Sequence, residues 1–500
     1  MGRYLVGICP ATVGTTASVY DIEGKKIGSG FVESVFHYPQ PGHIISREKD
    51  VLDGVFTACR KAIRTSGIDP KEVVAAAFAS QACVLTLLDR DEKVIGDMIG
   101  WQDVRSTTGI DLDEYMDREE IYDITLLKPD AGPSSFLLKL LWLRKNEPYK
   151  YEKTRMFATQ QDYFLQRFGV GGHSADIASL ARQNMVDVKA REFSPLIFDR
   201  LGFDVGRFPA ISASGVPIGR VSREAAGKSG LKEGTMLCVG AHDQSCYQIG
   251  VGALYPGDNF MLISTMGTCA VVCEQPLLDP RRSLTVKPNP GFGRWSMEGL
   301  TSCSAGSYRW FRDAFGYSGK GEDAYDAINV EVALSAPGAN GVTFIPYLQG
   351  AFGAKPNTNA RGAYVGMTAG TTRGDMARAV MEGITYELYD IIECERAAGV
   401  VLHKIRLTGF AANFPLWCQT VADILQIPVE VTGISDTGTL GAAMLAGVGA
   451  GVYRDVYEAA DQFVSITREY LPDPAMAPLY AEGFERYLAI IEGLEFSRVY

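Results

Sequence analysis

The chain has 500 residues, of which 46% are hydrophobic and 21% charged, a balance typical of folded globular domains and not of disordered or membrane proteins. Its formal net charge is −11, which argues against a nucleic-acid partner, because such partners bind a basic face. The length favours two or more domains, and no apolar run approaches the roughly 18 residues that a membrane-spanning helix needs.

The ten cysteines are scattered along the chain and form no CxxC pair. The closest two, Cys269 and Cys273, have no histidine nearby, so we expect no zinc site and no resident metal held by protein ligands. Free thiols in a chain of this size are typical of a reducing compartment. The N-terminal segment is a poor signal peptide, and we therefore expect a cytoplasmic protein.

The first 90 residues predict a β-meander followed by a helix and two further strands. The predicted elements are strands at 4–9, 17–21 and 26–33, a helix at 50–66, and strands at 73–78 and 84–89. The helix is expected because apolar residues recur in it at helical spacing. Strands, a helix and strands again favour an α/β layer architecture.

A second series of elements with a similar order starts near residue 260. It comprises strands at 260–265 and 270–273, helices at 309–315 and 323–334, a buried strand at 341–346, a long helix at 375–398 and a strand at 405–408. The segment 251–258, rich in glycine and proline, is typical of a linker. We therefore predict two domains, 1–250 and 251–500. A duplicated fold whose sequence repeat has eroded remains open.

Several motifs spread over nearly the whole chain follow a shared pattern. The most specific is Gly-Ala-Tyr-Val-Gly-Met at 362–367, followed after seven residues by Asp-Met-Ala-Arg-Ala-Val-Met-Glu at 375–382. Shorter motifs are Trp-Gln-Asp-Val-Arg at 101–105, Gly-Ala-His-Asp-Gln at 240–244 and Thr-Leu-Gly-Ala-Ala at 439–443. Together they resemble the FGGY family of carbohydrate kinases.

The resemblance implies an actin-like ATPase fold, in which two RNase H-like domains enclose a cleft. Sugar would bind deep in the cleft, mostly on the first domain, and the nucleotide would lie across both. The implied reaction is in-line transfer of a phosphoryl group from ATP, with Mg²⁺, to a hydroxyl of a ketose or polyol. The expected partners are thus small molecules, without nucleic acid or membrane, and a homodimer remains open.

Asp243 is the predicted catalytic base. It follows a strand-like run at 236–240, and a carboxylate at a strand end can reach into a cleft and accept a hydroxyl proton. It also matches the aspartate that the family uses as its base. The alternative is an aspartate that caps a helix beginning near Gln244. The preceding His242 resembles the His-Asp pair of fuculokinase-like and rhamnulokinase-like enzymes.

Four residues are predicted to bind the sugar: Gln81, Trp101, Asp103 and Gln244. An aromatic face packs on sugar C–H groups, and carboxylates and amides bind hydroxyls. For the segment at 101–105 the alternative is a buried tryptophan with a surface ion pair formed by Arg105. Gln81 is followed by neither the xylulokinase nor the glycerol kinase pattern, which disfavours both of those substrates.

The nucleotide phosphates are predicted to lie against two loops. Gly267 and Thr268 match the family's second phosphate loop, where a turn offers amide and hydroxyl donors. The first loop, Asp-x-Gly-Thr-Thr in the family, aligns without gaps to residues 9–13 and assigns Thr12 to the phosphates. In that alignment Cys9 replaces the aspartate that helps to place Mg²⁺, and Ala11 replaces a glycine. An alignment shifted to 14–16 also supplies no aspartate.

Gly409, Phe410 and Asn413 fall in the segment that resembles the family's adenosine loop. The family has two or three consecutive glycines there, and a phenylalanine would occupy space that adenine needs. Two hypotheses follow: an active ATP-dependent kinase, which we favour, and a sugar-binding homologue with impaired transfer. A sugar dehydrogenase or isomerase finds no support, because no GxGxxG follows a strand and no metal-ligand cluster occurs.

Overall fold

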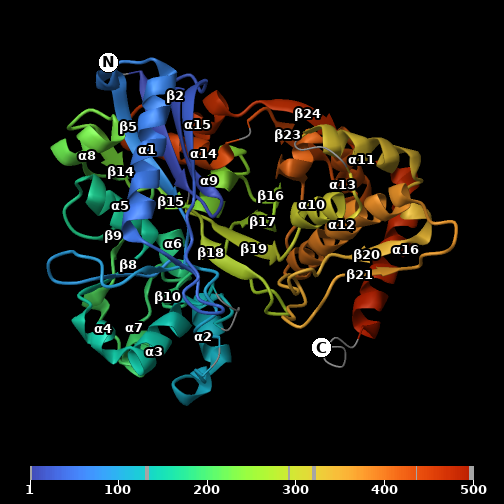
Figure 1. Cartoon of the computed structure of the whole chain (residues 1–500), viewed down its shortest axis with the longest axis horizontal. Helices are drawn as coiled ribbons and strands as arrows, with labels where there is room; N and C mark the ends of the chain where they lie inside the picture. Colours follow the sequence, from blue (N-terminus) through green and yellow to red (C-terminus); the bar gives the residue numbers. More distant parts are fainter. Residues whose placement is uncertain are drawn as a thin grey trace.

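The computed structural model describes residues 3–107, 109–129, 134–290, 293–317, 322–434 and 436–494. Two seven-stranded sheets, each flanked by helices, form the centres of two lobes (Figure 1). We call residues 3–250 with 436–463 the first lobe, and residues 258–434 with 466–494 the second lobe. No helix within the described ranges is both long and apolar enough to cross a membrane.

The first sheet grows from the predicted meander. Strand β1 pairs antiparallel with β2 on one side and parallel with β5 on the other, and β14 pairs parallel with β5. The strands, in the order β13-β14-β5-β1-β2-β3 with β15 also on β5, are β1 (Tyr4–Pro10), β2 (Gly14–Asp21), β3 (Lys26–Glu33), β5 (Val73–Ser80), β13 (Pro217–Arg220), β14 (Met236–Cys238) and β15 (Ala241–His242).

The second sheet repeats this arrangement. Strand β16 pairs antiparallel with β17 and parallel with β22, and β23 pairs parallel with β22. Its strands, in the order β18-β19-β17-β16-β22-β23-β24, are β16 (Asp258–Ile263), β17 (Gly267–Cys273), β18 (Thr285–Pro288), β19 (Trp295–Thr301), β22 (Lys404–Gly409), β23 (Val429–Thr432) and β24 (Ile466–Tyr470). The duplicated α/β fold that the sequence left open is therefore present.

Helices and short strands complete the lobes. The helices are α1 (Glu48–Ser66), α2 (Arg118–Thr125), α3 (Phe136–Asn146), α4 (Pro148–Lys153), α5 (Gln160–Phe168), α6 (Ile177–Ala181), α7 (Pro195–Leu201), α8 (Arg223–Ser229), α9 (Asp243–Gly250), α10 (Ala305–Ala314), α11 (Glu322–Leu334), α12 (Arg373–Ala397), α13 (Pro415–Leu425), α14 (Thr437–Gly449), α15 (Val456–Phe463) and α16 (Ala477–Gly493). The remaining strands are β4 (Ile45–Ser46), β6 (Thr86–Leu88), β7 (Met98–Ile99), β8 (Met156–Ala158), β9 (Ser174–Asp176), β10 (Val186–Asp187), β11 (Glu192–Phe193), β12 (Ala210–Ser212), β20 (Thr343–Ile345) and β21 (Ala363–Val365).

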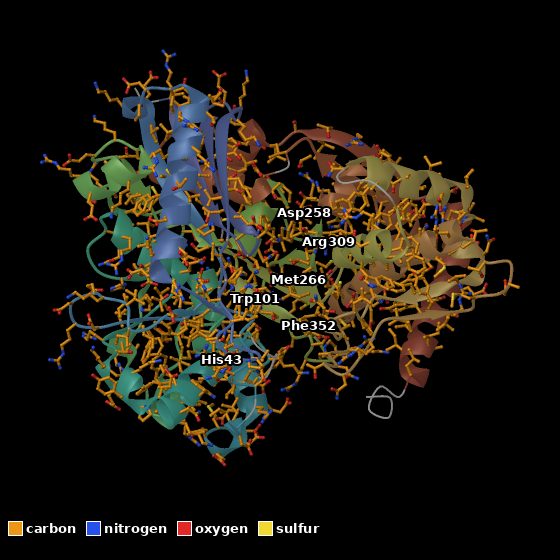
Figure 2. The ribbon with its side chains drawn as sticks, viewed as in Figure 1. His43, Trp101, Asp258, Met266, Arg309 and Phe352 are labelled. Carbon is orange, nitrogen blue, oxygen red and sulfur yellow. The ribbon has the colours of Figure 1, made fainter. Side chains whose placement is uncertain are left out.

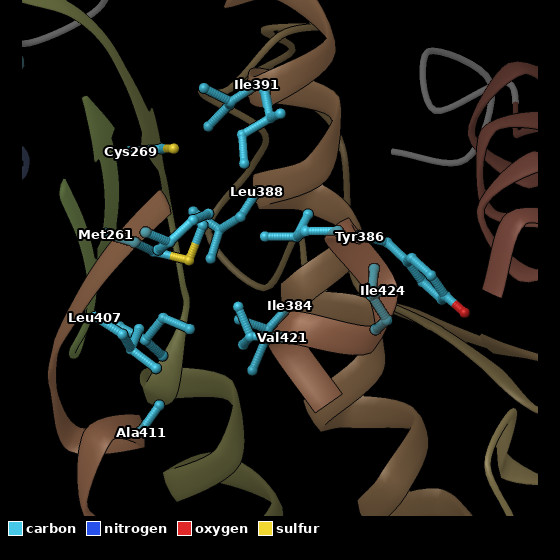
Figure 3. Packing of buried hydrophobic residues seen from close by; sticks show 14 of the residues in the cluster. Met261, Cys269, Ile384, Tyr386, Leu388, Ile391, Leu407, Ala411, Val421 and Ile424 are labelled. Carbon is cyan, nitrogen blue, oxygen red and sulfur yellow. The ribbon is translucent and has the colours of Figure 1, made fainter. Parts of the chain in front are cut away.

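The long helix α12 forms the core of the second lobe. It starts at a capping box, in which Thr372 and Asp375 satisfy each other's backbone N–H groups. Its Ile384 and Leu388 face Met261 of β16 and Leu407 of β22 (Figure 3). These side chains are fully or almost fully buried, at roughly 1.5–3 kcal/mol each, so the motif at 375–382 is at least partly a packing requirement.

Helix α14 lies in the first lobe, although in sequence it falls between β23 and β24 of the second sheet. It packs against β1, β5 and α9, with Leu440 and Met444 in a cluster that also contains Leu5 of β1. The loop at 251–257, between α9 and β16, lies at the predicted boundary. The division into 1–250 and 251–500 remains a prediction, because α14 and α15 cross back over it.

Candidate active site

Asp243 lies where one strand ends and one helix begins. Strand β15 pairs with the end of β5, His242 opposite Ser80, and Asp243 is the first residue of α9. Its Oδ1 accepts the backbone N–H of Gln244 at 2.7 Å and lies 3.2 Å from Nε2 of His242. One oxygen of Asp243 is thus held at the start of the helix, as the capping alternative expects, and its role as the base stays a prediction.

Burial raises the pKa of Asp243 from 3.8 to about 7, against the opposing effects of the Gln244 N–H, Lys287 and Arg182. The negative charge of Glu298 adds to the rise. The side chain is only 13% exposed, so the carboxylate is poorly hydrated. A carboxyl group whose pKa lies near neutral pH is well matched to accept a proton and to release it afterwards.

Three charged residues behind Asp243 were missed by the sequence reasoning: Arg182, Lys287 and Glu298. Lys287 forms a buried ion pair with Glu298, and Arg182 lies 3.7 Å from the other oxygen of Glu298. The sequence held a signal for two of them, because Lys287 and Glu298 are each a charged residue within a strand of otherwise mostly apolar or small residues. A charge inside a buried strand is rarely placed there without a partner.

Trp101 lies at the inner edge of the first lobe (Figure 2). There it contacts the hairpin formed by β1 and β2. Its indole N–H donates to Oγ1 of Thr12 at 3.1 Å. The ammonium of Lys139 donates to the carbonyls of Cys83 at 3.1 Å and of Trp101 at 3.5 Å. A small cavity between the hairpin and this loop is lined by Trp101 and Gln81, among others.

Asp103, which we predicted to bind sugar, has both carboxylate oxygens engaged within the protein. It is fully buried, and Oδ1 accepts the backbone N–H and Nε–H of Arg105 at 3.0 and 2.8 Å. Oδ2 accepts from Nη2 of Arg105 at 2.8 Å and from the Ile44 N–H at 2.6 Å. Both oxygens are therefore occupied, and the ion pair weighed as the alternative is present, but buried.

The two predicted glutamines are placed differently. Gln81 donates its Nε2 to the carbonyl of Pro10 at 3.1 Å and so fixes the end of β1. Oε1 of Gln244 is buried and has no hydrogen-bond partner in the described part of the chain. A buried amide oxygen without a partner is costly unless a ligand satisfies it, so Gln244 is the better candidate for a bound hydroxyl.

The first hairpin follows the alignment without gaps. Strand β1 ends at Pro10, β2 begins at Gly14, and Ala11 closes the turn by donating to the Gly14 carbonyl at 3.0 Å. The expected start of the second strand at residue 17 was three residues late. Thr12 therefore lies at the tip of the hairpin, and its contact with the nucleotide phosphates stays a prediction.

Cys9 is buried next to α9, with Sγ 3.8 Å from the hydroxyl of Tyr247. Burial, together with the charges of Asp243 and Asp436, raises the pKa of the thiol to about 12, so it stays neutral. A neutral thiol does not fit Mg²⁺, which prefers oxygen ligands. The described residues contain no cluster of three or more His, Cys, Asp or Glu arranged to hold a metal.

The second predicted phosphate loop differs from expectation. Gly267 and Thr268 are the first two residues of β17, buried, and the amide of Gly267 already donates to Oγ1 of Thr301 at 2.9 Å. The tip of the hairpin is the segment 264–266 instead, and Figure 2 draws Met266 between the lobes. The Gly-Thr pair predicts a turn because glycine is usually a turn signal; here the glycine allows close packing against Thr301.

The predicted adenosine loop lies at the same edge of the second sheet, since Gly409 pairs with Ile263. Gly409 has a φ of 86°, and a positive φ of this size favours glycine because glycine has no Cβ. The ring of Phe410 packs against Tyr325 and Phe414, both with centroids at 4.7 Å. Asn413 is exposed and donates to the Phe410 carbonyl at 3.3 Å.

Comparison with known proteins identifies the family. The N-terminal domain model of the FGGY family of carbohydrate kinases matches residues 4–250, and its C-terminal domain model matches residues 262–450. A xylulose kinase of Bacillus subtilis (strain 168) is 27% identical over 489 residues, covering 97% of this chain and 96% of its own.

Solved structures agree with this fold. A ligand-bound xylulose kinase from Lactobacillus acidophilus superimposes with a TM-score of 0.92 at 24% identity, over 99% of this chain and 100% of its own. A Plasmodium falciparum glycerol kinase with ADP gives 0.86 at 18% identity, over 98% of each chain. The two-lobed actin-like ATPase fold expected from the sequence is confirmed, and the chain belongs to the FGGY family of carbohydrate kinases.

Proposed function

We propose that this chain uses Asp243 as the base that activates a hydroxyl of a ketose or polyol for phosphorylation by ATP. Family membership supplies the reaction class, phosphoryl transfer from ATP to a sugar. The observation that carries the residue assignment is the largely buried Asp243, whose pKa lies at about 7 at the start of α9. The names of the relatives support a ketose or polyol as the acceptor.

The free oxygen of Asp243 defines the proton transfer. Oδ1 accepts the Gln244 N–H and lies 3.2 Å from Nε2 of His242, whereas no hydrogen bond from the described residues reaches Oδ2. Oδ2 would take the hydroxyl proton while the hydroxyl oxygen forms a bond to the γ-phosphorus and the bond to the bridging oxygen of ADP breaks. The proton then leaves Asp243 for solvent, which restores the base.

The remaining site residues would bind and orient. Trp101 would pack on the sugar ring, and Oε1 of Gln244 would accept a second sugar hydroxyl. Asp103 would act indirectly, because it fixes Arg105 and the Ile44 loop beside Trp101. The two hairpin tips, with Thr12 and with segment 264–266, would lie along the phosphates.

Mg²⁺ would enter as part of the nucleotide substrate. The chain does not supply the carboxylate expected at Cys9, so we derive no step through the ion. The alternative of an impaired homologue depends on Cys9 and Phe410. The comparisons give it no support, and Phe410 is anchored in an aromatic cluster on the second lobe.

The test is ADP release from ATP with a panel of ketoses and polyols. Asp243→Asn should lose most turnover, at least roughly 100-fold, while sugar binding is largely kept. Asp455→Asn is the matched control, because Asp455 also accepts N–H groups at the start of a helix but lies at α15. If Asp243→Asn turned over as fast as this control, Asp243 would not be the base.

A further inference from the structure

Helix α3 carries one charged residue in the middle of its buried side. The helix begins Phe-Leu-Leu-Lys-Leu-Leu-Trp-Leu, and Lys139 in this run is only 1% exposed. Its ammonium donates to two main-chain carbonyls, that of Cys83 at 3.1 Å and that of Trp101 at 3.5 Å. A charge in an apolar environment is costly unless it is paired, so packing alone does not explain this lysine.

The charge of Lys139 has no carboxylate of its own. Asp103 acts on it through charge, but both oxygens of Asp103 accept from Arg105, and Oδ2 also accepts the Ile44 N–H. Burial lowers the pKa of Lys139 from 10.5 to about 8, so the ammonium is still the main form at pH 7. The protein therefore keeps a buried cation whose hydrogen-bond partners are backbone carbonyls.

The two carbonyls lie opposite each other on two chain segments that begin to pair as strands. Leu85 and Ile99 form an antiparallel bridge and exchange both backbone hydrogen bonds, at 3.0 and 2.9 Å. Two residues further along each segment, the same register places Cys83 opposite Trp101. No backbone hydrogen bond joins these two within the described chain, and Lys139 instead donates to both carbonyls. The ammonium thus replaces the next rung of the ladder and holds the two segments apart at a fixed distance.

Both segments line the small cavity beside the first hairpin. The lining includes residues next to each of the two carbonyls: Gln81 and Val84 in the first segment, and Gly100, Trp101 and Gln102 in the second. Gln81 and Trp101 are two of the predicted sugar residues. Lys139 is not part of the lining, so it contacts this wall of the cavity from the protein side.

The backbone at Cys83 needs such support. Cys83 has a φ of 62°, a left-handed conformation that a residue with a Cβ adopts only when its surroundings hold it there. Its Sγ donates to the Arg182 carbonyl at 3.2 Å, and its own carbonyl accepts from Lys139. The turn after β5 is therefore fixed from two sides, and Lys139 is the side that also reaches Trp101.

We propose that Lys139 is a positioning residue for the acceptor, because its ammonium ties the Cys83 turn to the Trp101 segment and so sets the width of the sugar pocket. An ammonium suits this task, since its donors reach two carbonyls at once and an apolar side chain reaches neither. The inference rests on the proposed function. It adds a residue that determines acceptor affinity without touching the sugar.

The first experiment separates the two substrates of Lys139→Met, with the acceptor that gives the highest kcat/KM in the panel of ketoses and polyols. Methionine packs in a similar volume but donates no hydrogen bond. The KM for the acceptor should rise roughly tenfold, and the KM for ATP should stay within about twofold of the wild type, because only the sugar wall loses its tie. Lys139→Gln should raise the same KM, since its shorter side chain cannot span both carbonyls, and it takes the place of the methionine variant if that variant does not fold.

Arg144→Met is the matched control. Arg144 is a cation on the same helix, and its Nη1 donates to the Leu201 carbonyl at 2.6 Å, away from the cavity. This variant should keep both wild-type KM values. If Lys139→Met raised neither KM, or raised both equally, Lys139 would be a structural residue and the inference would be wrong. The proposed function fails differently, through a wild-type protein that releases no ADP with any acceptor or through wild-type turnover of Asp243→Asn.

A second measurement needs neither activity nor a ligand. Amide hydrogen exchange followed by mass spectrometry reports local opening of the backbone. In Lys139→Met, peptides that cover residues 81–85 and 100–105 should both exchange several-fold faster than in the wild type, whereas in Arg144→Met both should keep wild-type rates. Wild-type exchange of the two segments in folded Lys139→Met would overturn the inference, whatever the kinetics show.

Discussion

The raised pKa of Asp243 lowers the stability of the folded protein near neutral pH. The pKa of an ordinary aspartate is 3.8 and that of Asp243 in the folded protein is about 7, so between these values the native state binds a proton that the unfolded state has lost. Stability therefore falls as pH rises from about 4 to about 7, and it is constant above. At about 1.36 kcal/mol per unit, the loss is on the order of 4 kcal/mol at most.

Asp243→Asn should therefore be more stable than the wild type at pH 8 and nearly equal to it at pH 4. Asparagine keeps the shape of the side chain and carries no charge that must be buried. Thermal melts at pH 4 to 9 should show the difference growing across this window and then levelling. A constant difference at all pH values would mean that Asp243 ionises as it does in water.

Cys9 is the second residue with a testable consequence. Since its thiol stays neutral and Mg²⁺ prefers oxygen ligands, we expect the double change Cys9→Asp with Ala11→Gly to improve Mg²⁺-dependent transfer. The glycine is included because the methyl of Ala11 stands in the hairpin turn and would hold the loop away from the phosphates. ADP production against Mg²⁺ concentration measures the effect.

Cys9→Ser with Ala11→Gly is the control for this experiment, because it relaxes the loop without adding a carboxylate. Equal rates for the two double variants, at a wild-type rate already ordinary for a kinase, would show that Cys9 is no defect.

At the scale of residues, the sequence could predict a position that depends only on the local order of strand and helix. Asp243 and Gln244 are at a strand-to-helix junction, which the local pattern reveals. The sequence could not show that Asp103 spends both oxygens on Arg105 and Ile44, because Ile44 is distant in the chain. Lys287 and Glu298 each showed as a charge inside a buried strand, but the sequence could not show that Lys287 contacts His242 of the other lobe.

At the scale of elements, the crossing of α14 over β1 and α9 depends on glycines. A Cβ on Gly441 would overlap the carbonyl of Cys246 in α9, and one on Gly7 would overlap the carbonyl of Thr439 in α14. The backbones therefore touch directly. The motif at 439–443 was recognised from its resemblance, but its physical reason, a helix seated on another helix, appears only in the structure.

Gly441→Ala should consequently lower the melting temperature, because the added methyl forces α9 and α14 apart at about 1–3 kcal/mol or more. Gly227→Ala is the matched control: it lies inside helix α8, and nothing lies within 4 Å of its added Cβ. That change should stabilise by roughly 0.5–1 kcal/mol, since alanine is the better helix former. Equal effects of the two substitutions would contradict the close crossing.

Long amphipathic elements were predicted well and their ends less so. The strand at 26–33 matches β3, and the helix at 375–398 matches α12 to within two residues. The helix expected at 309–315 begins at Ala305 instead. Its first turn reads Ala-Gly-Ser, which carries no amphipathic signal, and it forms because Ser264 and Thr265 carbonyls accept its first amides.

At the scale of the molecule, the two lobes are joined firmly at one side. The indole N–H of Trp295 on β19 donates to the Val188 carbonyl at 3.1 Å, and the Val286 N–H donates to the Leu126 carbonyl at 2.8 Å. One apolar cluster includes Leu126 and Val188 together with the second sheet. This shared core makes the β18–β19 side the fixed one, so any relative motion of the lobes must occur where the hairpin tips lie.

We therefore expect the lobes to close on their ligands about this fixed side. The glycine-containing loop at 251–257 connects α9 to β16 and can absorb a rotation, because Gly252 and Gly257 both have positive φ. Small-angle scattering should show a smaller radius of gyration with sugar and a non-hydrolysable nucleotide together than with either alone. Asp243→Asn should close as the wild type does, because the base is needed for proton transfer and not for binding. An unchanged radius of gyration under saturating ligands would mean that the arrangement of Figure 1 already is the reactive one.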